Sequence, residues 1–403
     1  MVRSATTRCE FCGHRYIRPC TAETQAACGN TKLSIEPQVS IRHHYIPIFY
    51  LKRWCGGDGK ICEYSQPRDK IYDRRVVPKG TGFQDRLYEM KGVPKLIAQR
   101  IEHDFMSSVD NHAAEALKLL ETDAPKINGD QKHKSAWSLF LLSLLMRTPE
   151  DVAALIGIWD DDWEKGLPIL REQYEKNKKP GESRSLEEFI AQEDPDVKEK
   201  WAMSELPDLI DHQGIGQLLN NMHWFVITTE ADVPRLLTSD RPLFVSGKFG
   251  APDCYLTLPI APDRLFVAVH SKDAEAAFRA RPQKEVIEVT NVRTVEHAAK
   301  YVYGGDNAMS GFVAKHISRA RQPSFLRTCG CSGENDTLPR PRRTSRHRRP
   351  PATLYGERLA QPLLRTWRRS PPAADLRLDL ATSGPASPPA QRAHFTSSAE
   401  IHH

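Results

Sequence analysis

The 403-residue chain lacks three features: an apolar run long enough to cross a bilayer, a lysine after Lys315, and a regular cysteine pattern. Its longest apolar stretches, at residues 139–146 and 152–159, fall well short of the roughly 18–20 residues that a membrane-spanning helix needs. No apolar run of a secretory signal follows the first four residues. These absences predict a soluble, cytoplasmic protein that does not contact a membrane.

The charge of the chain is unevenly distributed along its length. From His316 to the C-terminus there are 15 arginines and six acidic residues, so this stretch contributes about +9 to the formal net charge of +6. The preceding body is slightly acidic, with a net charge of about −3. An apolar content of 39% with 27% charged residues excludes a wholly disordered or fibrous chain.

Residues 319–403 are rich in Arg, Pro and Ser and lack sustained apolar periodicity. Such a segment buries too little apolar surface to offset its conformational entropy, so we expect a disordered tail. Three origins fit it: sequence read out of frame from a GC-rich gene, a solvated linker, or an arm that binds nucleic acid through phosphates.

Residues 1–35 are a second segment of unusual composition and contain four of the nine cysteines. Cys9 and Cys12 have the Cys-x-x-Cys-Gly spacing of a zinc knuckle, which uses two thiolate pairs to hold one metal. Cys20 and Cys28 do not repeat that spacing, so a zinc site and a poorly ordered arm both remain open. An odd cysteine count without a secretory signal favours free thiols over disulfides.

Residues 36–318 have the composition of one globular body, in which the apolar period changes along the chain. Period-two alternation predicts strands, and three-to-four spacing predicts helices. The strands are expected at 60–65, 70–77, 224–229, 243–245, 255–258 and 265–269, and the helices at 95–121, 130–147, from 150, 186–203, 206–222, 272–280 and 291–303. We therefore predict an α+β fold, in which an N-terminal hairpin and C-terminal strands form a sheet and a helical block is inserted between them.

The densest chemical pattern is Arg-His-His-Tyr-Ile-Pro-Ile-Phe-Tyr-Leu-Lys-Arg-Trp, at residues 42–54. Pro47 suits the first position of a helix, so His43 and His44 are expected just before a helix N-terminus. Free backbone N–H groups at that position favour an anion or a neutral imidazole. Histidine transfers protons near neutrality and binds metals, but a ring packed in the core and a turn cap also explain the pair.

This segment resembles the start of the bacterial family catalogued as domain of unknown function 4238. The family opens with His-His-Tyr-(Val/Ile)-Pro-x-Phe-Tyr-Leu-x-x-Phe and then a short Asp-Gly-Lys-Ile strand. Residues 43–51 and 58–61 match both patterns, with Trp54 in place of the last phenylalanine. Further similarities follow in the family's order at 140–149, 237–242, 258–262 and Asn291, which the resemblance places at the start of the last helix. The resemblance covers about residues 41–315 and implies no established reaction.

A weaker resemblance concerns mechanism. His-His-x-x-Pro is similar to the opening of HNH-type nucleases, in which the first residue binds a metal and the second is the general base. Carried over, it implies that His43 binds a divalent metal and that His44 activates water for phosphodiester attack. The next histidine is His103 and the first asparagine is Asn111, so the chain departs from the nuclease pattern.

Further polar residues lie beside apolar motifs at three places in the chain. Arg147 closes an apolar helix, where it suits the helix dipole, binds a carboxylate or phosphate, or pairs with Asp240. Asp240 lies in a Thr-Ser-Asp turn after an apolar strand, where it either caps backbone N–H groups or joins a site. For Glu102, His103 and Asp104 we expect a solvated helix face, with Glu102 as the member that points toward a cleft.

The leading hypothesis is a His/Asp-dependent hydrolase, with a metal-assisted nuclease as one form. His44 is the general base, His43 the ligand of a divalent metal or phosphate, Asp240 the orienting carboxylate or second metal ligand, and Arg147 the anion clamp. The alternative is a non-enzymatic binding or scaffolding protein with an anion- or peptide-binding cleft. Because the body is acidic, any contact with nucleic acid is expected only at a local site.

Overall fold

The computed structural model describes residues 40–230, 232–247, 249–317 and 324–328, together with two short strands near the N-terminus. These strands, β1 (Thr7–Arg8) and β2 (Arg15–Tyr16), pair antiparallel. The rest of the N-terminal arm lies outside the described residues, with Cys9, Cys12, Cys20, Cys28 and the predicted zinc site. So does the predicted tail, apart from residues 324–328.

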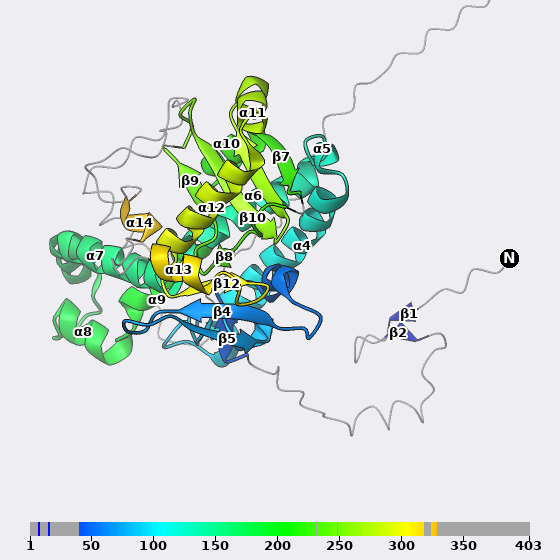
Figure 1. The fold of residues 1–403 in the computed structure, drawn as a ribbon. Coiled ribbons are helices and arrows are strands. Elements are labelled where there is room, and N and C mark those ends of the chain that lie inside the picture. The colour runs from blue at the N-terminus through cyan, green and yellow to red at the C-terminus, as the bar shows by residue number, and fades with distance from the viewer. Residues whose placement is uncertain are drawn as a thin grey trace, which may run out of the picture.

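Two four-stranded antiparallel sheets make up most of the β structure that is described (Figure 1). The first has the order β5-β4-β12-β8, with β4 (Ile61–Ser65), β5 (Tyr72–Val76), β8 (Thr238–Ser239) and β12 (Tyr301–Gly304). The second has the order β7-β11-β10-β9, with β7 (His223–Thr228), β9 (Phe244–Ser246), β10 (Tyr255–Ala261) and β11 (Arg264–Val269). A separate pair joins β3 (Arg42–His44) to β6 (Phe83–Asp85).

The predicted hairpin is confirmed, because β4 and β5 pair with Ile61 opposite Val76. Two late strands complete its sheet: Tyr303 of β12 lies opposite Glu63 on one side and Thr238 of β8 on the other. The α+β class is confirmed, with a block of helices between the early and the late strands. The C-terminal strands divide between the hairpin's sheet and the second sheet.

The inserted block is helical throughout and contains one π-helical turn. Its members are α3 (Lys95–Ala98), the π-helix η3 (Ile101–Met106), α4 (Ser107–Thr122), α5 (Ala124–Ile127), α6 (Gln131–Met146), α7 (Pro149–Asn177), α8 (Leu186–Glu193), α9 (Val197–Ile210) and α10 (Gln213–Asn221). Outside the block lie α2 (Ile48–Leu51), η1 (Lys52–Trp54), η2 (Pro78–Gly80), α11 (Lys272–Arg279), α12 (Gln283–His297), α13 (Ser310–His316) and α14 (Phe325–Thr328). Among the described helices, none has the length and apolar character that crossing a membrane requires.

Helices cover both faces of the second sheet. Successive side chains of a strand point to opposite faces, so neighbouring residues of this sheet contact different helices. On one face Phe266 of β11 contacts Trp137 of α6, with 5.7 Å between ring centroids. On the other face Phe225 of β7 contacts Phe278 of α11 at 6.0 Å, and α12 lies beside α11 (Figure 1). The sheet therefore lies between α6 and the late helices.

The predicted helix at 291–303 is wrong at both ends. The helix α12 begins earlier, at Gln283, and residues 301–304 form the strand β12 at the centre of the first sheet. Asn291 does not open a helix, because it lies within α12, where its buried side chain accepts from the Leu237 N–H at 2.8 Å and donates to the Arg235 carbonyl at 2.9 Å. The four residues of β12 are too few for their apolar period to distinguish a strand from the end of a helix.

Candidate functional site

The strand β3 presents His43 and His44 to opposite faces, because strand side chains alternate. The Tyr45 N–H, just after β3, donates to the Gly82 carbonyl on the side of β6 at 2.9 Å. The backbone groups of His44 therefore point away from β6. The His44 carbonyl accepts there from Nη2 of Arg147 at 2.9 Å.

His43 is a fully paired core residue. Its ring is 0% exposed and stacks on Tyr88 at 5.6 Å between centroids. Its Nδ1 accepts the Tyr88 backbone N–H at 2.9 Å, so Nε2 carries the proton and donates to Gln99 Oε1 and the Ser40 carbonyl. Burial lowers the pKa of His43. Both ring nitrogens are thus used within the fold, which leaves neither for the predicted metal or phosphate.

His44 has a different environment. Its ring lies against Phe83 at 5.5 Å, and burial and the charge of Arg147 lower its pKa, while a hydrogen bond to the Lys79 carbonyl raises it. Within the described residues, its Nε2 is buried and has no hydrogen-bond partner. His44 Nε2 is thus a buried polar atom that the described part of the fold leaves without a partner.

Arg147 follows α6 and is 1% exposed. Its guanidinium binds both carboxylate oxygens of Asp110, with Nη1 to Oδ1 at 2.7 Å and Nη2 to Oδ2 at 3.3 Å. The Tyr88 hydroxyl donates to the Arg147 carbonyl at 2.5 Å. The partner of Arg147 is thus Asp110 of α4, not Asp240. The contacts to Asp110 and His44 occupy the fork that an anion clamp would need. Of the three guanidinium nitrogens of Arg147, Nε is the one that is buried without a partner in the described chain.

Glu102 lies in the π-helix η3. Burial raises the pKa of this carboxyl to about 7, and Asp110 also raises it, while Arg147 and the His44 backbone N–H lower it. Its Oε2 is buried and without a partner among the described residues. The neighbouring side chains of His103 and Asp104 are exposed and bond to one another at 2.9 Å, which fits the predicted solvated face.

The π-helical turn explains how Glu102 and Asp110 come to act on the same arginine. In a regular α-helix, residues eight positions apart differ in direction by about 80°. A π turn has i→i+5 hydrogen bonds and takes more residues per turn, which reduces that difference. Such turns are frequent at functional sites. We call His44, Glu102, Asp110 and Arg147 the His44 centre.

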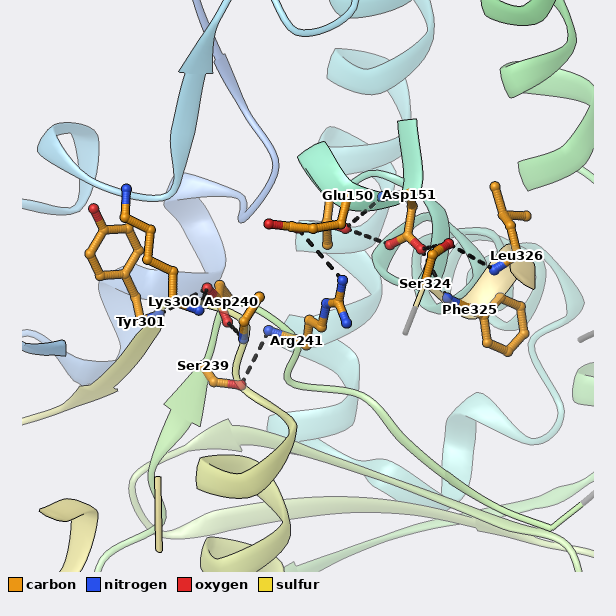
Figure 2. A network of polar contacts seen from close by, with 12 residues as sticks. Glu150, Asp151, Ser239, Asp240, Arg241, Lys300, Tyr301, Ser324, Phe325 and Leu326 are labelled. Atoms are coloured by element: carbon orange, nitrogen blue, oxygen red, sulfur yellow. Dashed lines mark hydrogen bonds and ion pairs between the residues drawn. The ribbon is translucent and has the colours of Figure 1, made fainter. Parts of the chain in front are cut away.

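Asp240 belongs to a different network (Figure 2). Its Oδ1 accepts from the Ala299 N–H at 2.8 Å, and its Oδ2 from the Lys300 and Tyr301 N–H groups at 2.7 and 2.9 Å. It is 2% exposed, and burial raises its pKa to about 6 although all three N–H groups lower it. Asp240 therefore anchors the turn before β12, and no hydrogen bond or ion pair in the described chain joins it to His44.

The same network continues from Asp240 through Arg241 to the first turn of α7. Arg241 forms an ion pair with Glu150 at 3.6 Å, and its backbone N–H donates to Ser239 Oγ at 3.2 Å. Figure 2 shows Glu150 and Asp151 of α7 on one side of Arg241 and Asp240 on the other. This network connects the first turn of α7 with the end of β8.

The predicted metal pair of His43 and Asp240 does not fit a metal ion. The nitrogens of His43 are used by Gln99, Ser40 and Tyr88, and the oxygens of Asp240 accept three backbone N–H groups. Across the ranges that the structure describes, no three His, Cys, Asp or Glu side chains form a set that could hold a metal ion. Cys55, Cys62 and Cys254 are free thiols, as predicted.

Comparison with known proteins supplies a family. The model of a family described as a protein of unknown function, DUF4238, matches residues 42–308, which include β3, the π-helix and Asp240. No curated protein and no solved structure matches the chain. Because the match covers more than half of the chain and every residue of the His44 centre, this chain belongs to the DUF4238 family.

Proposed function

We propose that the protein is a hydrolase whose acid–base groups are His44 and Glu102. The observation that carries this proposal is the pair of buried atoms without hydrogen-bond partners in the described chain, His44 Nε2 and Glu102 Oε2. An unpaired buried polar atom costs roughly 1–3 kcal/mol, so folds retain few of them. Both residues also feel the charges of Arg147 and Asp110, which sets them in one electrostatic environment.

The protonation states of the two groups suit hydrolysis near neutral pH. Neutral His44 accepts a proton from a water molecule at Nε2, and the resulting hydroxide attacks the substrate. Glu102, whose pKa is about 7, is partly protonated and gives its proton to the leaving oxygen as the bond to it breaks. Return of the proton from His44 to Glu102 through solvent restores both groups.

Arg147 and Asp110 act as positioning residues. The guanidinium holds the His44 carbonyl at 2.9 Å and is itself fixed by the two oxygens of Asp110. This arrangement holds the backbone of His44 in place, while the charge of Arg147 lowers the pKa of His44 and that of Asp110 raises it. Because the ion pair is internally neutral, we do not assign substrate binding to Arg147.

We propose phosphodiesters as the first substrate class to test, since the nuclease form is the sharpest version of the hypothesis. The experiment uses the full-length protein with bis(4-nitrophenyl) phosphate, 4-nitrophenyl acetate, single-stranded DNA and RNA, each with Mg²⁺, Mn²⁺, Zn²⁺ or EDTA. We expect phosphodiester turnover that falls above about pH 7 as Glu102 ionises. His44→Gln and Glu102→Gln should each lower kcat/KM by at least about 100-fold.

The matched control is His103→Gln, which changes an exposed residue next to Glu102 and should leave turnover unchanged. Equal losses of kcat/KM in His44→Gln and His103→Gln would contradict the acid–base assignment. So would turnover that does not fall above about pH 7 as Glu102 ionises. Absence of turnover on all four substrates would make the binding alternative the better account.

A groove of about 520 Å³ favours that alternative, a binding protein without catalysis. It lies at the end of the first sheet and is lined by Arg74, Lys300 and Tyr301, with the carboxylate of Glu63 bonded to Arg74 at 2.6 Å. Its volume falls within the roughly 300–1,000 Å³ of small-ligand pockets. Two cations beside one paired carboxylate suit a small organic anion.

A further inference from the structure

Residues 324–328 lie on the body beyond the end of the family match at residue 308. They form the short helix α14, which packs against α7 and α6 (Figure 1). Ser324 is 6% exposed and Leu326 is 3% exposed, so these two side chains are as buried as residues of the core. Six residues of sequence, 318–323, separate it from the end of the body.

The polar part of this contact is made by one carboxylate. Asp151, on the first turn of α7, is 2% exposed. Its Oδ1 accepts from the Ser324 hydroxyl at 2.6 Å and from the Phe325 backbone N–H at 3.0 Å (Figure 2). The Ser324 hydroxyl oxygen in turn accepts from the Leu326 N–H at 3.2 Å. One carboxylate thus recognises a hydroxyl and the backbone that follows it.

The apolar part of the contact holds the two residues after the serine. Leu326 belongs to the main hydrophobic core, and the ring of Phe325 meets that of Phe249 edge-on at 6.2 Å between centroids. A charged hydrogen-bonding anchor beside apolar anchors is how surfaces recognise short peptides. Without this segment, Asp151 Oδ1 would lose both of its contacts to Ser324 and Phe325.

We propose that the surface formed by Asp151, Phe249 and the adjoining faces of α6 and α7 is a peptide-docking site, occupied by residues 324–326 of the same chain. The site takes a hydroxyl residue followed by an aromatic and an aliphatic residue. Arg241 stabilises the charge of Asp151, and the Thr148 hydroxyl bonds its second oxygen, so the anchor is held in place without the peptide. This inference is independent of the hydrolase proposal, because it is argued from Asp151 and Phe249, which are not members of the His44 centre.

The test measures binding of the segment in trans. The probe is a fluorescent, end-capped pentapeptide of sequence Ser-Phe-Leu-Arg-Thr, and the protein is the full chain carrying Ser324→Ala and Leu326→Ala, which empties the site. We expect saturable binding to this variant and much weaker binding to the unaltered chain, whose own residues 324–326 compete for the site. Adding Asp151→Asn should weaken binding at least about tenfold, because it removes a charged acceptor of two hydrogen bonds.

A second measurement does not depend on how well the variant folds. In the unaltered chain, excess unlabelled peptide should speed hydrogen exchange at the Phe325 amide by competing for Asp151, whereas a peptide with alanine in place of the serine should not. No binding to the folded variant at millimolar peptide, or unchanged exchange at Phe325 with saturating peptide, would show that residues 324–328 are a fixed part of the core and would overturn the proposal.

Discussion

The His44 centre and the Asp240 network both bury carboxyl groups, but they satisfy them differently. Asp240 gives its two oxygens to three backbone N–H groups, and Asp151 accepts from Ser324 and Phe325. Glu102 leaves one oxygen unpaired, and the neighbouring His44 leaves one nitrogen unpaired, within the described residues. Buried charge in the Asp240 network ties segments together, whereas in the His44 centre it leaves groups able to exchange protons.

The pKa values show what this difference does. Burial raises the pKa of Asp240 to about 6, against three N–H groups that lower it. Burial also raises the pKa of Glu102, to about 7, although Glu102 is less buried than Asp240. At Glu102 the charge of Arg147 and the His44 backbone N–H lower the pKa, and the resulting value lies in the range where acid–base catalysts work.

The largest effect is expected at Asp240. Asp240→Asn replaces one acceptor oxygen with a donor, so at least one of the Lys300, Tyr301 and Ala299 N–H groups loses its partner in a buried place. We expect the free energy of unfolding, measured with urea at pH 7, to fall by about 3 kcal/mol. The control, Asp253→Asn, changes an exposed residue and should shift it by less than about 0.5 kcal/mol. Equal shifts would remove the distinction between the two regions.

A comparable effect, of opposite sign, is expected at Glu102. Its pKa is raised from 4.5 to about 7, so the folded state binds the proton more tightly than the unfolded chain does. Stability therefore falls as pH rises from about 4.5 to about 7. Glu102→Gln lacks this loss, so relative to the unaltered protein it should gain about 3 kcal/mol between pH 4.5 and pH 8. Urea unfolding at the two pH values checks this, and a difference that does not depend on pH would contradict it.

The smallest effect separates two adjacent histidines. His43→Gln removes the acceptor of the buried Tyr88 N–H and should lower the free energy of unfolding by about 2 kcal/mol. His44→Gln removes a ring whose Nε2 is unpaired and should cost less than about 1 kcal/mol, because no described hydrogen bond to that atom is lost. Urea unfolding of both variants at pH 7 measures the difference. A larger loss for His44 would reverse the roles assigned to them.

Much of the fold could be predicted from local pattern. The hairpin of β4 and β5, the helix α6 and the strands β7 and β11 follow from apolar period and turn residues. The strand β12 was missed, because four residues carry too little periodicity and the strand forms only where β4 and β8 provide edges for it. The boundary between α8 and α9 falls at residues 194–196, where the sequence predicted one continuous helix over 186–203.

The candidate site could be predicted only in part. His44, Arg147 and Glu102 were identified because each is a polar residue beside apolar motifs. Asp110 was missed, since it looks like an ordinary surface aspartate on an amphipathic helix, and its one sequence clue is its place beside the buried Val109. The π-helical turn that brings it near Glu102 depends on i→i+5 backbone hydrogen bonds, which the apolar residues of this segment do not specify.

By itself the sequence determined the α+β class, the helical block and the presence of a histidine pair before Pro47, because these depend on local apolar patterns and turn chemistry. Only the tertiary structure decided which histidine is paired and which is free, and that Arg147 holds Asp110 while Asp240 caps the turn before β12. The reason is physical: a buried polar group takes its protonation state from the donors and acceptors around it, and those come from distant parts of the chain.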